Sequence, residues 1–295
     1  MSFRSGLVAL AGRPNVGKST LANALAGQHV AAVSPRPQTT RRRIAAVVHG
    51  DGWQAVLLDL PGFQRPADRL TERMQRTVDR SLEDCDAALF VLNACEPVGR
   101  GDRFIAERLR RWGRPVIVAL NQVDRLRPPQ IAAAIERVAP LVDFVALHPV
   151  SALTGKGVPA LRDELPAVLP EGPPYFPAGV STDQTEEELA AEIVREAALQ
   201  RLREEVPHAL AVTVEELAPA GRGGRERVVR AAILVERDSQ KAIVVGQGGR
   251  MIRSIGIAAR RALARIWGVP VHLDLVVKVR RRWRQDESML DRLGL

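Results

Sequence analysis

The chain has 295 residues, 46% of them hydrophobic, and carries a formal net charge of +9. This composition excludes a disordered chain and leaves room for two domains with buried cores. Its two cysteines, Cys85 and Cys95, indicate neither a disulfide framework nor a CxxC metal pair, and the first residues lack an apolar stretch as long as a signal peptide or a membrane span, so we expect a cytoplasmic protein.

The positive charge is concentrated in the last part of the chain. Residues 183–216 hold 10 acidic and 3 basic side chains, whereas residues 222–284 hold 16 basic and 4 acidic ones. A domain with a positive field of this kind attracts polyanions. Nucleic acid is therefore the first expected partner, and a peripheral contact with the anionic inner surface of the membrane is the second.

The first part of the chain, residues 1–169, alternates short apolar runs with amphipathic helical stretches. The runs are "GLVALAG", "RIAAVVHG", "WQAVLLDL", "AALFVLNA", "PVIVALN" and "FVALHPV". Because consecutive apolar positions are typical of strands buried on both faces, they predict an α/β fold with a mostly parallel six-stranded sheet. The second and third runs, joined by "HGDGW", predict an antiparallel hairpin instead. Ligands of such sheets bind at the carboxyl ends of the strands.

The stretch after the first run, "GRPNVGKST" from Gly12 to Thr20, fits the phosphate-binding pattern GxxxxGK[S/T] at every fixed position. In such a P-loop the backbone N–H groups face the phosphates, the lysine reaches the β and γ oxygens, and the hydroxyl binds Mg²⁺. The last two roles fall to Lys18 and Ser19. The predicted nucleotide contacts of the loop are Gly12, Asn15, Val16, Gly17, Lys18, Ser19 and Thr20.

Two further motifs follow the third and fifth runs. "DLPG" supplies Asp59 for the outer shell of the metal and the amide of Gly62 for the γ-phosphate. "NQVD" spans Asn121 to Asp124 and includes Gln122. Its carboxylate can accept hydrogen bonds from guanine N1 and N2, whereas N1 of adenine offers only an acceptor. The second motif therefore predicts a preference for GTP over ATP.

The stretch "SAL" follows the sixth run. The amide of Ala152 could hold guanine O6, with Ser151 and Leu153 on either side. Four motifs in this order, each at the carboxyl end of a predicted strand, indicate a single nucleotide site.

Together, "GRPNVGKST", "SPRPQTTRRRI", "DLPGF", "NQVD" and "SAL" resemble the translation-factor-related class of GTPases, and within it the Era family of bacterial ribosome-assembly GTPases. The resemblance covers the whole chain, since "PEGPPYFP", "LAAEIVRE" and "VKVRRRW" also match. It implies that Thr40, with Thr39 as the alternative, binds Mg²⁺ when GTP is present. The residues that the resemblance implies for catalysis are Lys18, Thr40, Asp59, Gly62 and Asn15.

Three positions depart from the family pattern. Gln122 replaces the lysine of NKxD, whose cation and stem cover the base, so we expect weaker guanine binding. Leu60 stands in "DLPG" at a position that phosphate chemistry does not use. Phe63 stands where signalling GTPases have the glutamine that orients the attacking water, so unaided hydrolysis is expected to be slow. The resemblance implies that Asn15 helps to hold K⁺ against the phosphates, and a role in loop geometry alone is the alternative.

Residues 183–295 predict a second, α+β domain. The stretch "LPEGPPYFPAG" holds four prolines and predicts a semi-rigid linker over residues 170–182. After it come an amphipathic helix capped by Thr185, two alternating strands and a short helix. A long helix from about Arg250 to Trp267 and a strand from Val271 to Val279 complete the order α-β-β-α-α-β.

The loop "GQGG", Gly246 to Gly249, lies between the two helices of this basic domain. That placement resembles the type II KH fold, whose GxxG loop clamps the backbone of four single-stranded nucleotides. A second GxxG, Gly221 to Gly224, lies between two strands and predicts a hairpin. The run "KVRRRWR" that begins at Lys278 is either an RNA-backbone contact, which we prefer, or a solvated strand end. The predicted RNA contacts are Gly246, Gln247, Gly248, Gly249, Arg250, Arg253, Lys278 and Arg280.

The sequence thus predicts an α/β P-loop GTPase domain over residues 1–169 and a type II KH domain over residues 183–295. The resemblance implies a monomeric GTP-hydrolysing switch that uses GTP, GDP, Mg²⁺ and K⁺, binds the 3′ end of 16S ribosomal RNA and assists maturation of the 30S subunit. Two alternatives stay open: a phosphotransferase of the P-loop kinase class, and an RNA-binding module with a weakened nucleotide site, for which Gln122 is the support.

Overall fold

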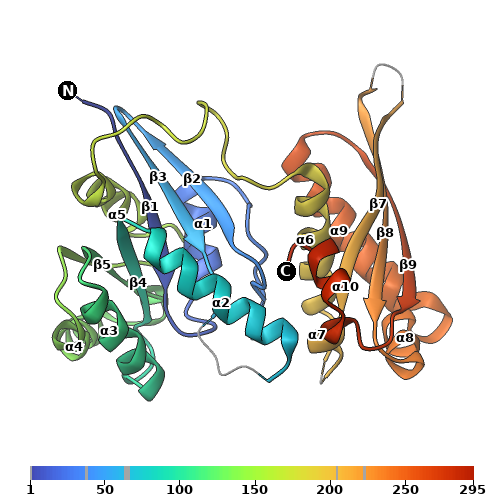
Figure 1. Cartoon of the computed structure of the whole chain (residues 1–295), viewed down its shortest axis with the longest axis horizontal. Coiled ribbons are helices and arrows are strands. Elements are labelled where there is room, and N and C mark those ends of the chain that lie inside the picture. Colours follow the sequence, from blue (N-terminus) through green and yellow to red (C-terminus); the bar gives the residue numbers. More distant parts are fainter. Residues whose placement is uncertain (1, 37–38, 63–66, 204, 222–223) are drawn as a thin grey trace. The chain divides into compact units, whose positions relative to one another are not determined.

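The computed structural model describes residues 2–36, 39–62, 67–203, 205–221 and 224–295. The chain divides into two compact units. Unit 1 comprises residues 1–31, 40–65 and 75–183, and unit 2 comprises residues 32–39, 66–74 and 184–295. Each unit has its own sheet and its own core (Figure 1).

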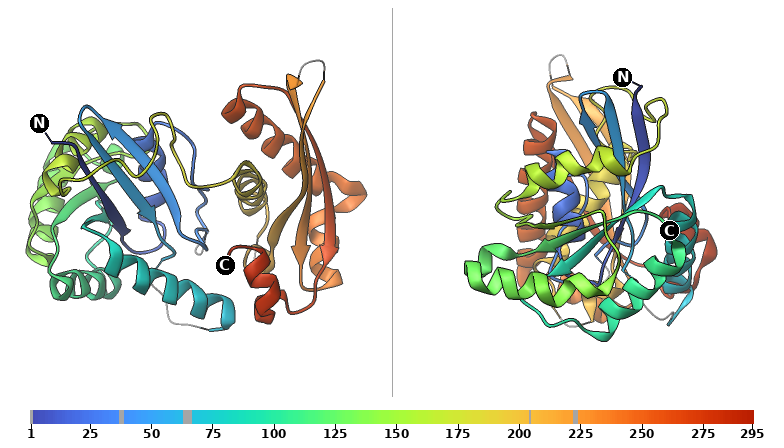
Figure 2. Two further views of the ribbon diagram at one scale, coloured as in Figure 1. Left: turned by 45° about the horizontal axis from the view of Figure 1, so that its top comes forward. Right: turned by 90° about the vertical axis from the view of Figure 1, so that its left-hand side faces the viewer.

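Within the described residues, unit 1 is built on a six-stranded sheet with the spatial order β2-β3-β1-β4-β5-β6. All neighbouring strands pair in parallel except β2 and β3, which form an antiparallel hairpin. β1, β2 and β3 lie side by side in Figures 1 and 2. The predicted α/β sheet is therefore confirmed. The strands are β1 (Arg4–Ala11), β2 (Ile44–Gly50), β3 (Trp53–Asp59), β4 (Ala87–Asn93), β5 (Val116–Asn121) and β6 (Ala146–Pro149).

Helices cover both faces of this sheet. Leu21 and Leu161, from α1 and α5, pack on the face to which Val8 points, whereas Ile105 of α3 packs on the opposite face with Ala9. Because the strands are buried on both sides, their sequences are apolar at consecutive positions. The helices are α1 (Lys18–Ala26), α2 (Arg69–Asp84), α3 (Arg100–Trp112), α4 (Pro128–Val138) and α5 (Val158–Glu164), and 3₁₀ turns occupy Val123–Arg125, Ala139–Leu141 and Leu165–Val168.

The proline-rich segment predicted as a linker packs on unit 1. The hydroxyl of Ser5 donates to the carbonyl of Pro173 (2.6 Å). The side chain of Gln54 accepts a hydrogen bond from the amide of Phe176 (3.0 Å) and donates to the carbonyl of the same residue (2.8 Å). Side chains of β1 and β3 thus satisfy backbone groups of a segment whose prolines cannot join a sheet ladder. For this reason unit 1 continues to Asp183.

Unit 2 contains, over its described residues, a three-stranded sheet of order β7-β8-β9. β7 and β8 are antiparallel, and β8 and β9 are parallel. The predicted long helix and last strand begin and end where the sequence placed them, while the short helices α7 and α10 were not predicted. The elements are α6 (Glu186–Leu199), α7 (Val206–Ala209), β7 (Ala211–Ala220), β8 (Glu226–Val235), α8 (Asp238–Val245), α9 (Arg250–Trp267), β9 (Val271–Val279) and α10 (Glu287–Arg292), with 3₁₀ turns at Gln247–Gly249 and Trp283–Gln285.

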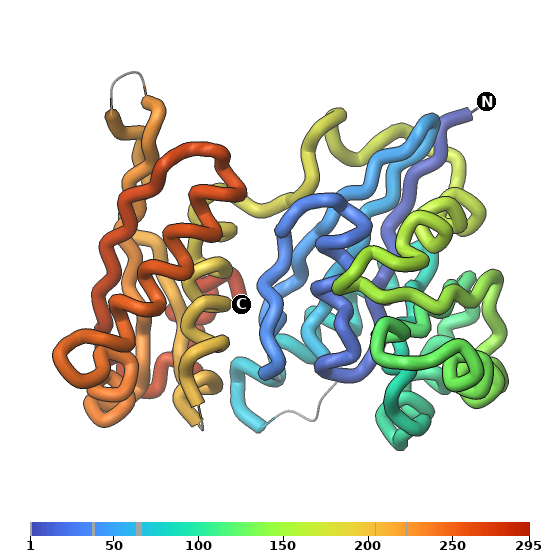
Figure 3. The backbone as a smooth tube through the Cα atoms, turned by 180° about the vertical axis from the view of Figure 1, so that it is seen from behind, coloured from blue at the N-terminus to red at the C-terminus, as the bar shows by residue number. Residues whose placement is uncertain are grey.

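The sheet of unit 2 separates two cores. Ile233 of β8 belongs to the core formed with α6, α8 and α9, and the next residue, Leu234, belongs to a smaller core around Trp283 and Leu290. α6 and α9 lie side by side (Figure 3). Trp283 is fully buried, and its Nε1 donates to the carbonyl of Ala209 (2.8 Å). The second core explains α10, whose apolar residues cover the rear of the sheet.

Residues 32–39, from the first part of the chain, group with unit 2. Nη2 of Arg36 donates to the carbonyl of Leu202 (3.1 Å). The buried guanidinium of Arg195, on α6, donates to the carbonyl of Thr39. The segment just before Thr40 is therefore held by the C-terminal part of the chain.

Residues 66–74 group with unit 2 as well, and they include the beginning of α2. Leu70 and Met74 join the core around Trp283. Asp68 pairs with Arg284, whose position is thereby fixed. Both segments are distant in sequence from the rest of unit 2, so no local pattern predicts where they pack.

Candidate active site and nucleic-acid interface

The P-loop follows β1 and ends at the start of α1. A Cβ on Gly12 would lie 2.5 Å from the carbonyl oxygen of Val91, and one on Gly17, whose φ is +97°, would lie 2.2 Å from Nδ2 of Asn121. Neither position can hold a side chain. α1 begins at Lys18 after this glycine N-cap, so the N–H groups of its first turn face a site without a capping side chain. A helix N-terminus of this kind binds anions.

Lys18 is held inside the P-loop. Its Nζ donates to the carbonyls of Gly12 and Arg13, both at 3.0 Å, and the side chain is buried. Burial lowers the pKa of Lys18, and the charge of Asp59 opposes part of this shift. A buried ammonium group whose charge is costly is stabilised by an anion, so the loop is electrostatically suited to phosphate.

The other predicted loop residues take three different positions. Val16 is buried in the core of unit 1, and Thr20 is part of α1. Asn15 is exposed and has a left-handed backbone, with φ at +64°. This geometry fits both interpretations of Asn15, because asparagine tolerates left-handed φ values and an amide oxygen can serve as a cation ligand.

Ser19, Thr40 and Asp59 bring their oxygen atoms together beside α1. Ser19 Oγ donates to Asp59 Oδ2 at 2.6 Å, and Thr40 Oγ1 lies 3.0 Å from the same carboxylate oxygen and 3.1 Å from Ser19 Oγ. Hydroxyl and carboxylate oxygens are ligands that Mg²⁺ prefers, so the residues fit the predicted metal site. The hydroxyl of Thr39 instead donates to the carbonyl of Arg36 (2.7 Å). The geometry favours Thr40 over Thr39.

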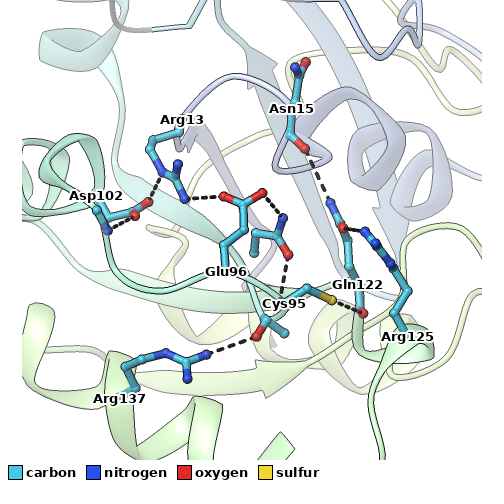
Figure 4. Close-up of polar contacts among 11 residues, drawn as sticks. Arg13, Asn15, Cys95, Glu96, Asp102, Gln122, Arg125 and Arg137 are labelled. Carbon is cyan, nitrogen blue, oxygen red and sulfur yellow. Dashed lines mark hydrogen bonds and ion pairs between the residues drawn. The ribbon is translucent and has the colours of Figure 1, made fainter. Parts of the chain in front are cut away.

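Arg13 anchors the P-loop to the start of α3 (Figure 4). Its Nε donates to Oδ1 of Asp102 (2.7 Å), and its Nη2 lies 2.8 Å from Oε2 of Glu96. The hydrogen bond to Asp102 raises the pKa of Arg13. The other carboxylate oxygen of Asp102 accepts from the amide of Gly99 and so caps α3. This ion pair cannot be predicted from the sequence, because no local pattern joins residues 89 positions apart.

Asn121, the first residue of "NQVD", connects the loops of the site. Its Nδ2 donates to the carbonyl of Val16 (2.9 Å), and its Oδ1 accepts from the amide of Ala152 (2.9 Å). The role of this amide as a contact for guanine O6 stays a prediction, and it would require the N–H group to be shared between Asn121 and the base. Asn121 is 2% exposed and acts as a positioning residue for both loops.

The remaining residues of the predicted base site differ in exposure. Asp124 is exposed, as a residue that contacts a ligand base would be. Gln122 is partly exposed and has a left-handed backbone, with φ at +69°. Ser151 is fully buried, and its hydroxyl accepts from the amide of Thr154 (3.2 Å), so it shapes the loop. Leu153 is 79% exposed, so it is accessible to a bound nucleotide.

Four positions of "DLPGF", Asp59 to Gly62, lie in the described residues, and Phe63 does not. Leu60 is buried in the core of unit 1, which explains its hydrophobic character. Gly62 lies against the P-loop, where a Cβ would be 3.1 Å from Cγ of Pro14. The prediction for Phe63 concerns a residue outside the described part of the chain.

The GxxG loop of unit 2 is a 3₁₀ turn between α8 and α9. Gly246, Gly248 and Gly249 all have positive φ values, at 70°, 60° and 76°. A Cβ on Gly246 would lie 2.9 Å from the amide of Met251, whereas around Gly248 and Gly249 there is open space. The last two glycines therefore leave their backbone open to a ligand. Gln247 is exposed and its Oε1 accepts from Arg250.

A groove adjoins this loop between α9 and β9. The cavity has a volume of about 410 Å³ and is lined by Ile252, Arg253, Gly256, Ile257, Arg260, Leu273 and Leu275. Its lining combines apolar side chains with two arginines, which suits flat bases that carry phosphates. Gly256 was not predicted, although glycine in the middle of a helix costs about 1 kcal/mol and so signals a special role. Its missing side chain keeps the groove open beside Leu275, since a Cβ there would lie 3.6 Å from Cδ1 of that leucine.

A second cavity of about 590 Å³ runs along α9. The arginines among its lining residues are Arg201, Arg250, Arg253, Arg261 and Arg265. A surface of this kind binds a phosphate backbone rather than a base.

The basic run at the end of β9 divides into exposed and structural residues. Lys278 pairs with Glu215 (2.5 Å), and Arg280 lies 3.7 Å from Asp286. Both side chains are exposed, so the two predicted RNA contacts are accessible. Trp283 is fully buried, and for this position neither a solvated strand end nor an RNA contact is correct. Its hydrophobic surface fills the second core of unit 2.

Comparison with known proteins gives the same two parts. The family described as "50S ribosome-binding GTPase" matches residues 7–122, and the KH domain family matches residues 205–284. The proteins named GTPase Era from Mycobacterium tuberculosis and Mycobacterium bovis are 46% identical over 298 residues, which is 99% of this chain and 99% of theirs. The chain belongs to the Era family of GTPases. It is therefore an enzyme that hydrolyses GTP, with a KH domain after its GTPase domain.

The fold of this chain is also similar to that of solved Era structures. A variant of Era from Aquifex aeolicus bound to GDP and AlF₄⁻ superposes with a TM-score of 0.93 at 36% identity, and 99% of each chain is covered. Era in complex with MgGDPNP and nucleotides 1506–1542 of 16S ribosomal RNA superposes with a TM-score of 0.90, also at 36% identity and with the same coverage.

Proposed function

We propose that this Era-family chain is a GTP-driven switch that binds the 3′ end of 16S ribosomal RNA and assists assembly of the 30S subunit. One observation supports this more than any other. The chain combines a P-loop that places Lys18 beside Ser19, Thr40 and Asp59 with a second glycine loop whose Gly248 and Gly249 are open to a ligand. The Era structure with MgGDPNP and 16S ribosomal RNA carries both kinds of ligand.

The nucleotide site is proposed to take GTP or GDP with Mg²⁺. Ser19 and Thr40 would hold the metal directly and Asp59 would hold it through water, and the ion then neutralises charge between the β- and γ-phosphates. Lys18 donates to the phosphate oxygens in place of the two loop carbonyls that it contacts here. The amide of Gly62 donates a hydrogen bond to the γ-phosphate, and Asp124 selects guanine by accepting hydrogen bonds from N1 and N2.

Hydrolysis by the chain alone is proposed to be slow and stimulated by K⁺. With Asn15 as a K⁺ ligand, turnover is expected to be about tenfold faster in K⁺ than in Na⁺ at equal ionic strength, since ~1.4 kcal/mol of transition-state stabilisation suffices. Phosphate release in the two salts measures this. In Asn15→Ala the rates in K⁺ and Na⁺ should be equal. The rate in Na⁺ then measures the turnover that does not depend on K⁺. Equal rates for the unmodified chain in both salts would contradict the role of Asn15 as a K⁺ ligand and would favour a role in loop geometry alone.

The RNA site is proposed to hold a single strand across the GxxG loop and the groove between α9 and β9. Backbone amides of the loop, with Arg250 and Arg253, contact phosphates, and the apolar floor of the groove receives bases. Lys278 and Arg280 contribute positive charge at the end of β9. The arginine-lined cavity along α9 is suited to more of the phosphate backbone.

The protein is proposed to act as a monomer in the cytoplasm, with the 30S subunit as its larger partner. None of the helices in the described residues has the length and hydropathy that a membrane span requires. A peripheral contact with the inner face of the membrane through the basic surface of unit 2 stays part of the proposal.

Nucleotide state is proposed to control how the KH domain is presented to RNA. Thr40 lies at the metal site, while its neighbour Thr39 is held by Arg195 within unit 2. Gly62 similarly precedes a segment whose Leu70 packs in unit 2. Movement of Thr40 or Gly62 with the γ-phosphate is therefore proposed to be passed along the chain to residues of the RNA-binding unit.

One experiment tests the proposed enzyme and its selectivity. Purified protein with Mg²⁺ and K⁺ is given GTP or ATP, and phosphate release is followed. Release from GTP alone is expected. Release from ATP at a similar rate would contradict the role of Asp124, and no release from either would favour an RNA-binding module with a weakened nucleotide site.

A further inference from the structure

The side chain of Gln122 connects the P-loop to a neighbouring arginine (Figure 4). Its Nε2 donates to the carbonyl of Asn15 (3.4 Å), and its Oε1 accepts from Nη1 of Arg125 (3.0 Å). The glutamine amide thus lies between a P-loop carbonyl and a guanidinium group. It satisfies both, since an amide has a donor at one end and an acceptor at the other.

Backbone geometry holds this arrangement in place. Gln122 has φ 69° and ψ 28°, and it is the N-cap of the 3₁₀ turn Val123–Arg125. The amide of Arg125 donates to the carbonyl of Gln122 (3.2 Å), which also accepts from Sγ of Cys95 (3.5 Å). In a 3₁₀ turn the side chains three residues apart lie on the same side. The turn therefore places the guanidinium group directly beside Gln122.

Arg125 brings an exposed positive charge to this site. Throughout the described parts of the chain, no carboxylate forms an ion pair with this guanidinium, and the side chain is exposed. Glu96, an acid of the same region, pairs with Arg13. The site therefore holds a planar cation beside Asp124, the residue that selects the base.

We propose that Arg125 is a specificity-determining residue that covers one face of the guanine base, held in position by the amide of Gln122. This rests on the proposed guanine-nucleotide site. A guanidinium group is planar and stacks on flat aromatic surfaces, and its positive charge is attracted to their faces. Gln122 supplies the contact to the P-loop and Arg125 supplies the cation, so the two side chains together do what a single lysine at position 122 would do. Guanine binding is then stronger than it would be in a chain with Gln122 but without Arg125.

The test measures GDP affinity of the full chain by titration calorimetry. Arg125→Ala is expected to weaken GDP binding about tenfold, between the values for an exposed and a desolvated stacked cation. Gln122→Ala is expected to weaken it similarly, because the arginine loses its anchor. The double variant should bind GDP with about the affinity of the single variant that binds it less tightly. Arg127→Ala removes another exposed arginine two residues away and is the matched control, with GDP binding expected within about twofold of the unmodified chain.

Two further measurements separate base coverage from a structural effect on the P-loop. When Arg125→Ala is added to Gln122→Lys, GDP affinity should fall by less than twofold, because the lysine already supplies the cation. Binding of magnesium pyrophosphate, which has no base, should be the same in Arg125→Ala and Arg127→Ala.

Two results would overturn the inference: GDP affinity in Arg125→Ala equal to that in Arg127→Ala, or an equal loss of pyrophosphate and GDP binding in Arg125→Ala. Failure of the unmodified chain to bind GDP would instead contradict the proposed function itself.

Discussion

Lys18→Met is expected to abolish measurable GTP turnover and to weaken GDP binding about 100-fold or more. The ammonium group is buried in the P-loop, and its charge is suited to a bound phosphate. Removing one partner of a buried charge pair costs about 3 kcal/mol, which corresponds to this factor. Calorimetric titration with GDP and phosphate release from GTP measure the two effects.

The fold is expected to survive this change. Burial lowers the pKa of Lys18, so at a pH below that pKa the buried charge reduces the free energy of unfolding. A neutral methionine of similar length removes this destabilising charge. Thermal unfolding without nucleotide should therefore show a melting temperature at or above that of the unmodified chain. GDP affinity that stays within a few-fold of the original would show that Lys18 does not contact phosphate.

Gly248→Asp is expected to weaken RNA binding about 30-fold. Gly248 has a left-handed backbone with open space around it, so aspartate fits the fold. Its carboxylate would stand where an RNA phosphate approaches the loop amides, and like charges in contact cost ~2 kcal/mol or more. Fluorescence anisotropy with a labelled single-stranded RNA that matches the 16S 3′ end measures the change.

The second glycine loop of unit 2 provides the control. Gly224 also has a left-handed backbone, with φ at +70°, and a Cβ there would make an ordinary contact of 3.6 Å with Pro219. Gly224→Asp therefore brings the same side chain and charge into a hairpin between two strands. Its RNA affinity is expected to stay within about twofold, because one distant charge changes binding little at moderate salt. Equal losses in both variants would mean that net charge, not the GxxG loop, governs RNA binding.

Motifs that depend on local chemistry could be predicted from the sequence. The P-loop, the β2–β3 hairpin and the bounds of α9 and β9 all follow from glycine spacing, turn chemistry or apolar periodicity. Each is fixed within about twenty residues of chain, where period and turn chemistry are reliable guides.

Contacts between distant segments could not be predicted in the same way. The ion pair of Arg13 with Asp102, the engagement of Ala152 by Asn121 and the burial of Trp283 all depend on which elements meet in three dimensions. The packing of residues 66–74 in unit 2 is of the same kind. Composition made Trp283 look like part of a basic surface, since its neighbours are arginines, whereas the second core needed a large apolar side chain.

The central claim is that nucleotide state controls RNA binding, and one measurement tests it most directly. The affinity of the full chain for a short single-stranded RNA matching the 16S 3′ end is determined with a non-hydrolysable GTP analogue and with GDP. We expect binding to be about tenfold tighter with the analogue, a coupling free energy of ~1.4 kcal/mol. Equal affinities in the two states would contradict the switch, even if both glycine loops bind the ligands proposed for them.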